Sequence, residues 1–145
     1  MPQESTSPRI LTGRCLCKAV TFTVSAKPRW VAHCHCESCR RATGSAFTTY
    51  AGFAKTDFNW TGGTPGEFRS SPGVTRRFCR RCGSPVSFEG ERWPDEIHLF
   101  LASFDEPEAL KPTLHVHAEE QLSWLRLADG LPRYAKTPRD GPPLP

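Results

Sequence analysis

The chain has 145 residues, close to the commonest size of a single domain, and is 37% hydrophobic and 23% charged, with a formal net charge of +4. Its 11 glycines and 14 prolines make it rich in turns and leave limited apolar material for a core. Seven cysteines, an odd number, cannot all pair within one chain, so a secreted disulfide scaffold is disfavoured. Residues 1–10 lack an apolar signal core and no stretch approaches the length of a membrane span, so we expect a cytoplasmic protein with reduced thiols and no membrane partner.

The chain pattern predicts one mainly β domain at residues 10–136 between two tails. Residues 1–9 are polar, and residues 137–145 are dominated by proline; neither segment has the apolar side chains to offset the entropy of ordering. Residues 19–24 alternate apolar side chains with threonine, which is typical of a half-buried strand. Further short strands are expected at residues 47–53, 67–70, 75–78, 86–88, 96–102 and 113–117.

Helical signals are few. Residues 37–43 predict one short helix, because Gly44 supplies a C-terminal stop and two arginines lie near the negative end of the helix dipole. A second short helix is expected from Pro107 and a helical turn at residues 123–127. No glycine pattern of a nucleotide-binding loop and no fixed repeat is present, so the common nucleotide-binding α/β architectures have no support. The predicted fold class is mainly β with one or two short helices.

The seven cysteines form three tight groups. They are Cys15-Leu16-Cys17, Cys34-His35-Cys36-Glu37-Ser38-Cys39 and Cys79-Arg80-Arg81-Cys82. Two thiolates one or two residues apart can reach one zinc ion from a single turn, and Gly83 lets the backbone fold tightly beneath such an ion. Buried free thiols would seldom cluster in this way, and a redox pair lacks its usual βαβ context. The clustering therefore predicts zinc binding.

Seven thiolates divide naturally into four and three. The two outer pairs would close one tetrahedral site, which is structural because a saturated ion leaves no position for substrate. The central group would share a second zinc with an open fourth position, as catalytic zinc sites have. The ligands of the first zinc are then Cys15, Cys17, Cys79 and Cys82. The ligands of the second zinc are Cys34, Cys36 and Cys39.

Spacing alone leaves two alternatives to this division. The central triplet could instead recruit a fourth cysteine from one of the pairs, or His33 or His35 could complete and close its coordination shell. A structural zinc contributes on the order of 10–16 kcal/mol of apparent binding free energy, as much as the net stability of a typical domain. We therefore expect the first zinc to be needed for folding.

These motifs resemble those of the glutathione-dependent formaldehyde-activating enzyme family, which also includes centromere protein V. The similar segments are GRCLC at residues 13–17, CHCESCRRATGSAF at residues 34–47, RFCRRCGSP at residues 77–85 and DGLPRY at residues 129–134. The resemblance implies a β-tent fold, two zinc ions per chain and the same division of ligands. It also implies the activity of S-(hydroxymethyl)glutathione synthase, a carbon–sulfur lyase in the reverse direction. The family usually has glycine where this chain has Lys18, so a positive φ there would strain the lysine.

The leading hypothesis is a zinc-dependent carbon–sulfur lyase that joins a small thiol, such as glutathione, and an aldehyde at the open three-cysteine zinc. Glutathione carries two carboxylates, for which arginines beside the cysteine motifs are candidate partners; the same cations would also offset thiolate charge. His35 is the nearest candidate proton carrier. The arginines are Arg40, Arg41, Arg76, Arg77, Arg80 and Arg81. The aromatic residues expected in the core or in a pocket wall are Trp30, Phe47, Trp60, Phe78 and Trp93.

The alternative hypothesis is a non-enzymatic zinc module that binds protein or nucleic acid. Nucleic acid is the weaker partner, because the chain has no zinc-finger spacing of two cysteines and two histidines, no basic tail and no aromatic RNA-binding motif. A histidine or buried side chain at the fourth position of the second zinc would favour the module. An open position inside a pocket would favour the enzyme.

Overall fold

The computed structural model describes residues 9–145, and the predicted mainly β class is confirmed. Apart from residue 9, the expected N-terminal tail lies outside the described residues. Among the described residues, no helix is long and apolar enough to cross a membrane. The strands are β1 (Leu11–Arg14), β2 (Thr21–Val24), β3 (Trp30–Cys34), β4 (Thr48–Ala54), β5 (Phe58–Gly62), β6 (Gly66–Ser71), β7 (Val74–Phe78), β8 (Pro85–Gly90), β9 (Glu96–Phe100) and β10 (Leu114–Val116). The helices are α1 (Glu37–Thr43) and the short 3-10 turns Lys55–Asp57, Leu101–Ser103, Pro107–Ala109 and Ala118–Glu120.

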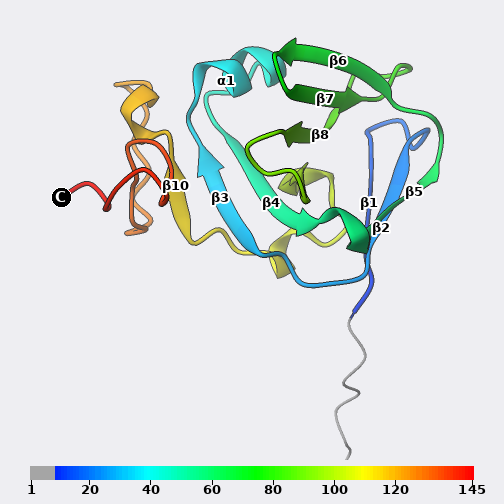
Figure 1. Cartoon of the computed structure of the whole chain (residues 1–145), viewed down its shortest axis with the longest axis horizontal. Coiled ribbons are helices and arrows are strands. Elements are labelled where there is room, and N and C mark those ends of the chain that lie inside the picture. The colour runs from blue at the N-terminus through cyan, green and yellow to red at the C-terminus, as the bar shows by residue number, and fades with distance from the viewer. Residues whose placement is uncertain (1–8) are drawn as a thin grey trace, which may run out of the picture.

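The strands form two sheets of unequal size. The larger has seven strands in the order β10-β3-β4-β9-β8-β7-β6, and in it only β10 and β3 run parallel. The smaller is the antiparallel sheet β1-β2-β5. Figure 1 shows this small sheet on the right of the molecule, opposite β10 and the C-terminus on the left. The sheet edge at β10 is therefore the place where the end of the chain meets the fold.

The cross-strand register gives the large sheet two chemically different faces. Successive side chains of a strand point to opposite faces, and directly paired residues share a face. One face carries Leu114 and Val116 of β10, Trp30, Ala32 and Cys34 of β3, Tyr50 of β4, Glu96 and His98 of β9, Phe88 of β8 and Arg76 of β7. The other face carries the apolar Val31, Ala51, Phe53, Ile97 and Leu99, and at the β10 edge His33 and His115. One face thus serves the core and the other is free for a site.

The main hydrophobic core combines that apolar face with side chains of the small sheet. Phe22 of β2 is its aromatic centre, with Phe104 edge-on at 5.2 Å and Phe58 tilted at 5.7 Å between ring centroids. Gly13 on the paired strand has to be glycine, because a Cβ there would lie 2.2 Å from the Phe22 ring. Burying one such aromatic side chain is worth about 1.5–3 kcal/mol.

Helix α1 forms where it was predicted. Gly44 follows it with φ 70°, and its N–H bonds to the carbonyl of Arg40. At the other end Cys36 is the N-cap, and its sulfur accepts the backbone N–H of Cys39 at 3.3 Å. Two of the three central cysteines, Cys36 and Cys39, therefore lie in the first turn of the helix.

Several elements differ from the sequence expectation. Three strands, β1, β3 and β5, were not predicted; β3, with the sequence WVAHC, lacks the apolar–polar alternation because both of its faces are partly buried. The expected strand at residues 96–102 ends at Phe100, where a 3-10 turn begins. The expected helix from Pro107 is a single 3-10 turn, and residues 123–127 hold a hydrogen-bonded turn from Leu125 to Leu122 in place of a helical one.

The C-terminal segment lies against the domain. Residues 132–136 run along β10: the His115 N–H donates to the carbonyl of Pro132, and the His115 carbonyl accepts the N–H of Tyr134. The His117 N–H donates to the carbonyl of Lys136 at 2.7 Å. This pairing falls within the predicted domain and covers an edge strand that would otherwise expose unpaired backbone groups. The tail expected from composition begins at residue 137, and there Asp140 contacts Arg92 at 2.8 Å and the N–H of Leu144 donates to the carbonyl of Arg133.

Lys18 has φ 72°, a left-handed conformation that glycine adopts without strain and a lysine does not. Replacing Lys18 by glycine should raise the free energy of unfolding by about 1 kcal/mol, since the Cβ clash disappears. Urea unfolding measures the change. Lys27→Gly is the control, because Lys27 is also exposed but has no positive φ, and it should leave stability unchanged or lower it. A Lys18→Gly protein no more stable than the parent would contradict the strain.

Candidate metal centre

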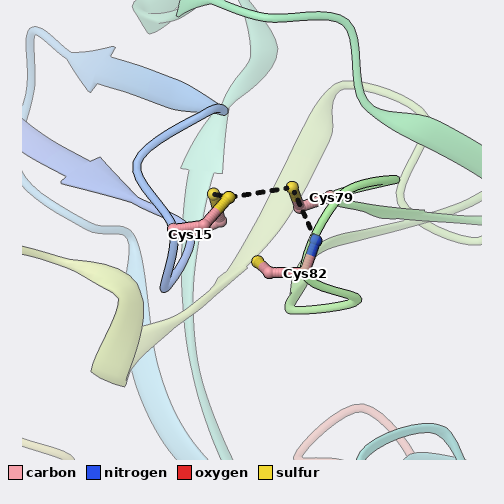
Figure 2. A group of neighbouring side chains, drawn as sticks. Cys15, Cys79 and Cys82 are labelled. Atoms are coloured by element: carbon pink, nitrogen blue, oxygen red, sulfur yellow. Dashed lines mark hydrogen bonds between the residues drawn. The ribbon is translucent and has the colours of Figure 1, made fainter.

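Four cysteines from two distant loops converge beside the core. Cys15 and Cys17 follow β1, and Cys79 and Cys82 follow β7. Figure 2 shows Cys15, Cys79 and Cys82 pointing toward one another from these two loops. The sulfurs of Cys15 and Cys17 are 3.7 Å apart, as are those of Cys17 and Cys79. All four ligand atoms lie within 4.8 Å of one another.

This sulfur spacing fits one tetrahedral metal ion. A metal–sulfur bond of about 2.3 Å gives sulfur–sulfur edges of about 3.8 Å in a regular tetrahedron. The Cys15–Cys17 and Cys17–Cys79 edges are both 3.7 Å. Backbone N–H groups of Val20 and Cys82 point at the sulfurs of Cys15 and Cys79, at 3.3 and 3.5 Å, as they do around bound thiolates. Gly83 has φ 77°, the tight turn expected beneath the cluster. These four residues can fill all four coordination positions of a tetrahedral metal ion.

The central three cysteines form a separate cluster. Cys34 ends β3, and Cys36 and Cys39 lie at the start of α1; the sulfurs of Cys34 and Cys39 are 3.9 Å apart. Among the described residues, no fourth cysteine, histidine or carboxylate joins this group. The spacing again fits a tetrahedral ion, here with three protein ligands. The described residues therefore do not form the alternative site in which a fourth cysteine joins the triplet.

Neither flanking histidine joins the triplet. His33 Nδ1 pairs with Thr49 Oγ1 at 2.8 Å, and His35 Nε2 pairs with His115 Nδ1 at 2.9 Å. His33 is one residue out of phase with Cys34 in β3, so the alternation of the strand turns it to the other face, and His35 stacks on His115 of that same face. Burial, followed by the neighbouring His115, lowers the pKa of His35 to about 4. The expectation that His35 is the proton carrier beside the triplet finds no contact to support it.

A cavity of about 560 Å³ opens beside the triplet, on the sheet face that carries Cys34. Two of the predicted aromatic residues, Trp30 and Trp93, line it, whereas Trp60 packs against the core. Residues 137–139 of the C-terminal segment close one side of it. Its other principal walls are Cys36, Cys39, Tyr50, Arg76, Phe88, Glu96 and His98. The volume suits a ligand of tripeptide size.

Tyr50 and Arg76 surround the sulfur of Cys39. The Tyr50 hydroxyl donates to this sulfur at 3.4 Å, and Arg76 Nη2 does so at 3.8 Å while its Nη1 donates to the Tyr50 oxygen at 3.4 Å. The Arg76 guanidinium also lies 5.1 Å above the Phe88 ring. Hydrogen bonds from Cys34 and Cys36, supported by Tyr50 and Arg76, lower the pKa of Cys39. These contacts favour the thiolate at Cys39 alone. Hydrogen bonds with the other two thiols raise the pKa of Cys34, and although the bond with Cys34 opposes it, Cys39 and burial raise the pKa of Cys36 to about 11.

A buried carboxylate and an imidazole line the same pocket from β9, two strands from the arginine. Glu96 accepts from Trp30 Nε1 at 3.3 Å, from Arg29 Nη1 at 3.3 Å and from His98 Nε2 at 3.1 Å. Although burial opposes it, bonds led by that of His98 hold the pKa of Glu96 below its usual value. Burial lowers the pKa of His98, which is packed against Phe88, so this imidazole is neutral near pH 7. The Nε2–H group of His98 then donates to Glu96, and Nδ1 of the same ring carries no proton.

Sequence reasoning missed Tyr50, Glu96 and His98. The signal available was the strand EIHLF, in which Glu96 and His98 are two residues apart and so share one face. Of the six arginines considered, only Arg76 lines the pocket. Arg40 and Arg41 belong to α1, Arg77 pairs with glutamates on both neighbouring strands, and Arg80 and Arg81 are exposed beyond the Cys79 turn.

The family profile described as glutathione-dependent formaldehyde-activating enzyme matches residues 10–120. The chain belongs to this family. A curated relative is an uncharacterized lyase of Schizosaccharomyces pombe. It is 32% identical to this chain over 76 residues, which cover 52% of this chain and 55% of the relative. The match thus spans about half the length of that relative. The crystal structure of a Rhodobacter sphaeroides protein shares the fold, with a TM-score of 0.55 and 20% identity over 85% of this chain and 99% of the other.

The two cysteine clusters of this family member should differ in their effect on stability. Cys82→Ser should abolish the cooperative thermal transition or lower the free energy of unfolding by at least about 3 kcal/mol, because it breaks a metal link between two distant loops. Cys36→Ser is the matched control, since Cys36 is likewise half-buried but its cluster joins only neighbouring residues. Circular dichroism and metal content per chain measure both variants. Equal loss of stability in the two would contradict this division.

Proposed function

We propose that the protein is a zinc-dependent carbon–sulfur lyase of the S-(hydroxymethyl)glutathione synthase type. The observation that carries the proposal is the three-cysteine cluster, which borders a cavity of about 560 Å³ and has no fourth protein ligand among residues 9–145. Membership of the family and the lyase named among its relatives support the same reaction class. A saturated ion would have no place for a substrate, whereas three ligands leave one.

Zinc is the metal that the donor sets fit best. Thiolate-only sites with tetrahedral spacing select zinc over cations that prefer oxygen ligands. Cys15, Cys17, Cys79 and Cys82 would hold a structural zinc, and Cys34, Cys36 and Cys39 would hold the second. When bound at the triplet, zinc supplies a Lewis-acid position where a thiol ionises near neutral pH.

The reaction joins the sulfur of the thiol to the carbonyl carbon of the aldehyde. One carbon–sulfur bond forms, the C=O π bond breaks, and the carbonyl oxygen takes up the proton that the thiol released, so no oxidant or reductant is needed. His98 lines the pocket as a neutral imidazole, and Glu96 fixes its orientation. Its Nδ1 can accept the thiol proton and return it to the product oxygen. The reverse sequence is the lyase direction.

Binding of the thiol substrate depends on the charged groups of the pocket. Arg76 and Arg139 both line it and are the natural partners for the two carboxylates of glutathione. Trp30, Phe88 and Trp93 supply apolar walls that keep water from the reacting atoms. The pocket thereby offers the size, charge and apolar surface that this tripeptide needs.

The alternative of a non-enzymatic zinc module lacks its distinguishing feature. A histidine or a buried side chain at the fourth position of the second zinc would favour that hypothesis, but within the described part of the chain His33 and His35 pair with other groups and no fourth ligand joins the triplet. The arginine pairs also fail to form one basic surface, because Arg77 is neutralised by Glu67 and Glu89. The pocket beside the triplet supports the enzyme.

Zinc-loaded protein should accelerate the exchange between formaldehyde, glutathione and their hemithioacetal in proportion to its concentration. Exchange spectroscopy by NMR measures this rate against the spontaneous background. Cys39→Ser should lower the protein-dependent rate at least about 100-fold, because it removes a ligand of the open ion. Arg81→Ala, which alters an exposed residue outside the pocket, should keep the parent rate. A protein with full zinc and no acceleration would refute the proposed reaction.

Arg76→Gln should lower kcat/KM about 100-fold, because a charge that contacts both Cys39 and the substrate pocket is lost. Arg76→Lys should recover only part of this loss, since lysine keeps the charge but not the two-pronged donor geometry. Arg77→Gln, one residue along β7 and on the opposite face, should change kcat/KM less than threefold if it folds normally. Steady-state kinetics at several glutathione concentrations distinguish these outcomes, and an unaffected Arg76→Gln protein would contradict the role.

A further inference from the structure

The sheet face opposite the pocket carries a cluster that the proposed reaction does not use. His33 of β3 and His115 of β10 are direct neighbours in the parallel register, and Asp129 of the C-terminal segment reaches both. Asp129 Oδ2 lies 2.8 Å from His115 Nε2 and 3.9 Å from His33 Nε2. The three ligand atoms all lie within 4.8 Å of one another. We propose that these three side chains form an additional binding site for a divalent transition-metal ion.

Both imidazoles are oriented for this role by contacts at their other nitrogen. His33 Nδ1 pairs with the hydroxyl of Thr49, and His115 Nδ1 pairs with His35 Nε2. Each ring therefore has Nδ1 engaged and Nε2 turned toward Asp129, the arrangement that metal-binding histidines usually have. His115 is 1% exposed and its ring lies 4.9 Å from that of His33, so packing limits the reorientation of either ring.

The donor set selects the class of ion. Two imidazoles and one carboxylate suit zinc, iron(II), cobalt(II) or nickel(II), whereas calcium and magnesium prefer oxygen ligands throughout. Ligands about 2.0–2.1 Å from such an ion are about 2.9–3.4 Å apart, so the 3.9 Å separation of His33 and Asp129 has to shorten by roughly half an ångström. The Asp129 side chain is 32% exposed and can make this movement. Its exposure also gives an ion access from solvent.

The site would join three parts of the chain that are far apart in sequence. An ion held there links β3 and β10 to the segment that begins at Asp129. The same segment continues along β10 and reaches the pocket on the other face through residues 137–139. Occupancy of this site would therefore hold in position the part of the chain that closes one side of the pocket.

Metal stoichiometry tests the site without reference to activity. The full chain is equilibrated with buffered zinc chloride, separated by gel filtration and analysed for zinc per chain. We expect three equivalents for the parent and two for Asp129→Asn. Asp140→Asn is the matched control, since Asp140 is a carboxylate of the same segment that pairs with Arg92 instead, and it should retain three. Two equivalents in the parent, or no difference between the parent and Asp129→Asn, would overturn the site.

Cobalt(II) gives a second readout that reports folding of the variants. Cobalt bound by cysteines has intense sulfur-to-metal charge-transfer bands, whereas cobalt bound by histidine and carboxylate has only weak ligand-field bands. Asp129→Asn should keep the charge-transfer intensity of both cysteine clusters and lose the last cobalt equivalent. If that intensity falls, the variant has lost its fold and His33→Gln replaces it in the same titration. Because the cysteine-bound equivalents are counted separately, failure of this site does not affect the proposed reaction, and the reverse is also true.

Discussion

The register of the seven-stranded sheet is the constraint on which the rest of the structure depends. Side chains alternate between the two faces, so the pairing of Cys34 with Thr48 and of Gly52 with His98 decides what each face contains. A slip of one residue would place the apolar core residues in the pocket and bury the polar ones. The register also explains why residue 52 is glycine. It pairs Gly52 with Trp30, and a Cβ at position 52 would lie 2.2 Å from the Trp30 ring.

With a metal ion bound, the four-cysteine cluster would supply the cohesion that a turn-rich chain with a modest core lacks. It joins the loop after β1, in the small sheet, to the loop after β7, in the large one. A bound structural zinc is worth on the order of 10–16 kcal/mol, comparable to the whole net stability of a domain. The three-cysteine cluster is different, because all its ligands lie within the junction of β3 and α1. The free energy of metal binding at this cluster would therefore fix the geometry of the pocket and contribute little to holding the two sheets together.

The sequence allowed prediction of those features that are local in the chain. Cysteine spacing predicted both clusters as groups, and Gly44 predicted the end of α1, because each depends on residues within a few positions. Pocket residues such as Tyr50 and His98 depend on pairing between β4 and β9, which lie far apart in sequence, so no local pattern singled them out. The same holds for the proline-rich residues 137–145, whose contact with the domain through Asp140 and Arg92 joins residues far apart in sequence.

The charged groups that matter for binding lie on the two faces of the large sheet, and the net charge of the chain matters less. Seven thiolates bound to two dications would remove most of the formal +4, so an overall attraction to anions is not the property that matters. What remains is local: Arg76 next to Cys39 on the pocket face, and a single carboxylate, Asp129, next to two histidines on the other. The C-terminal segment contacts both places across the edge strand β10. If the proposed ion binds, that edge is where metal binding on one face can reach the pocket on the other, because one continuous segment, residues 129–139, contacts both.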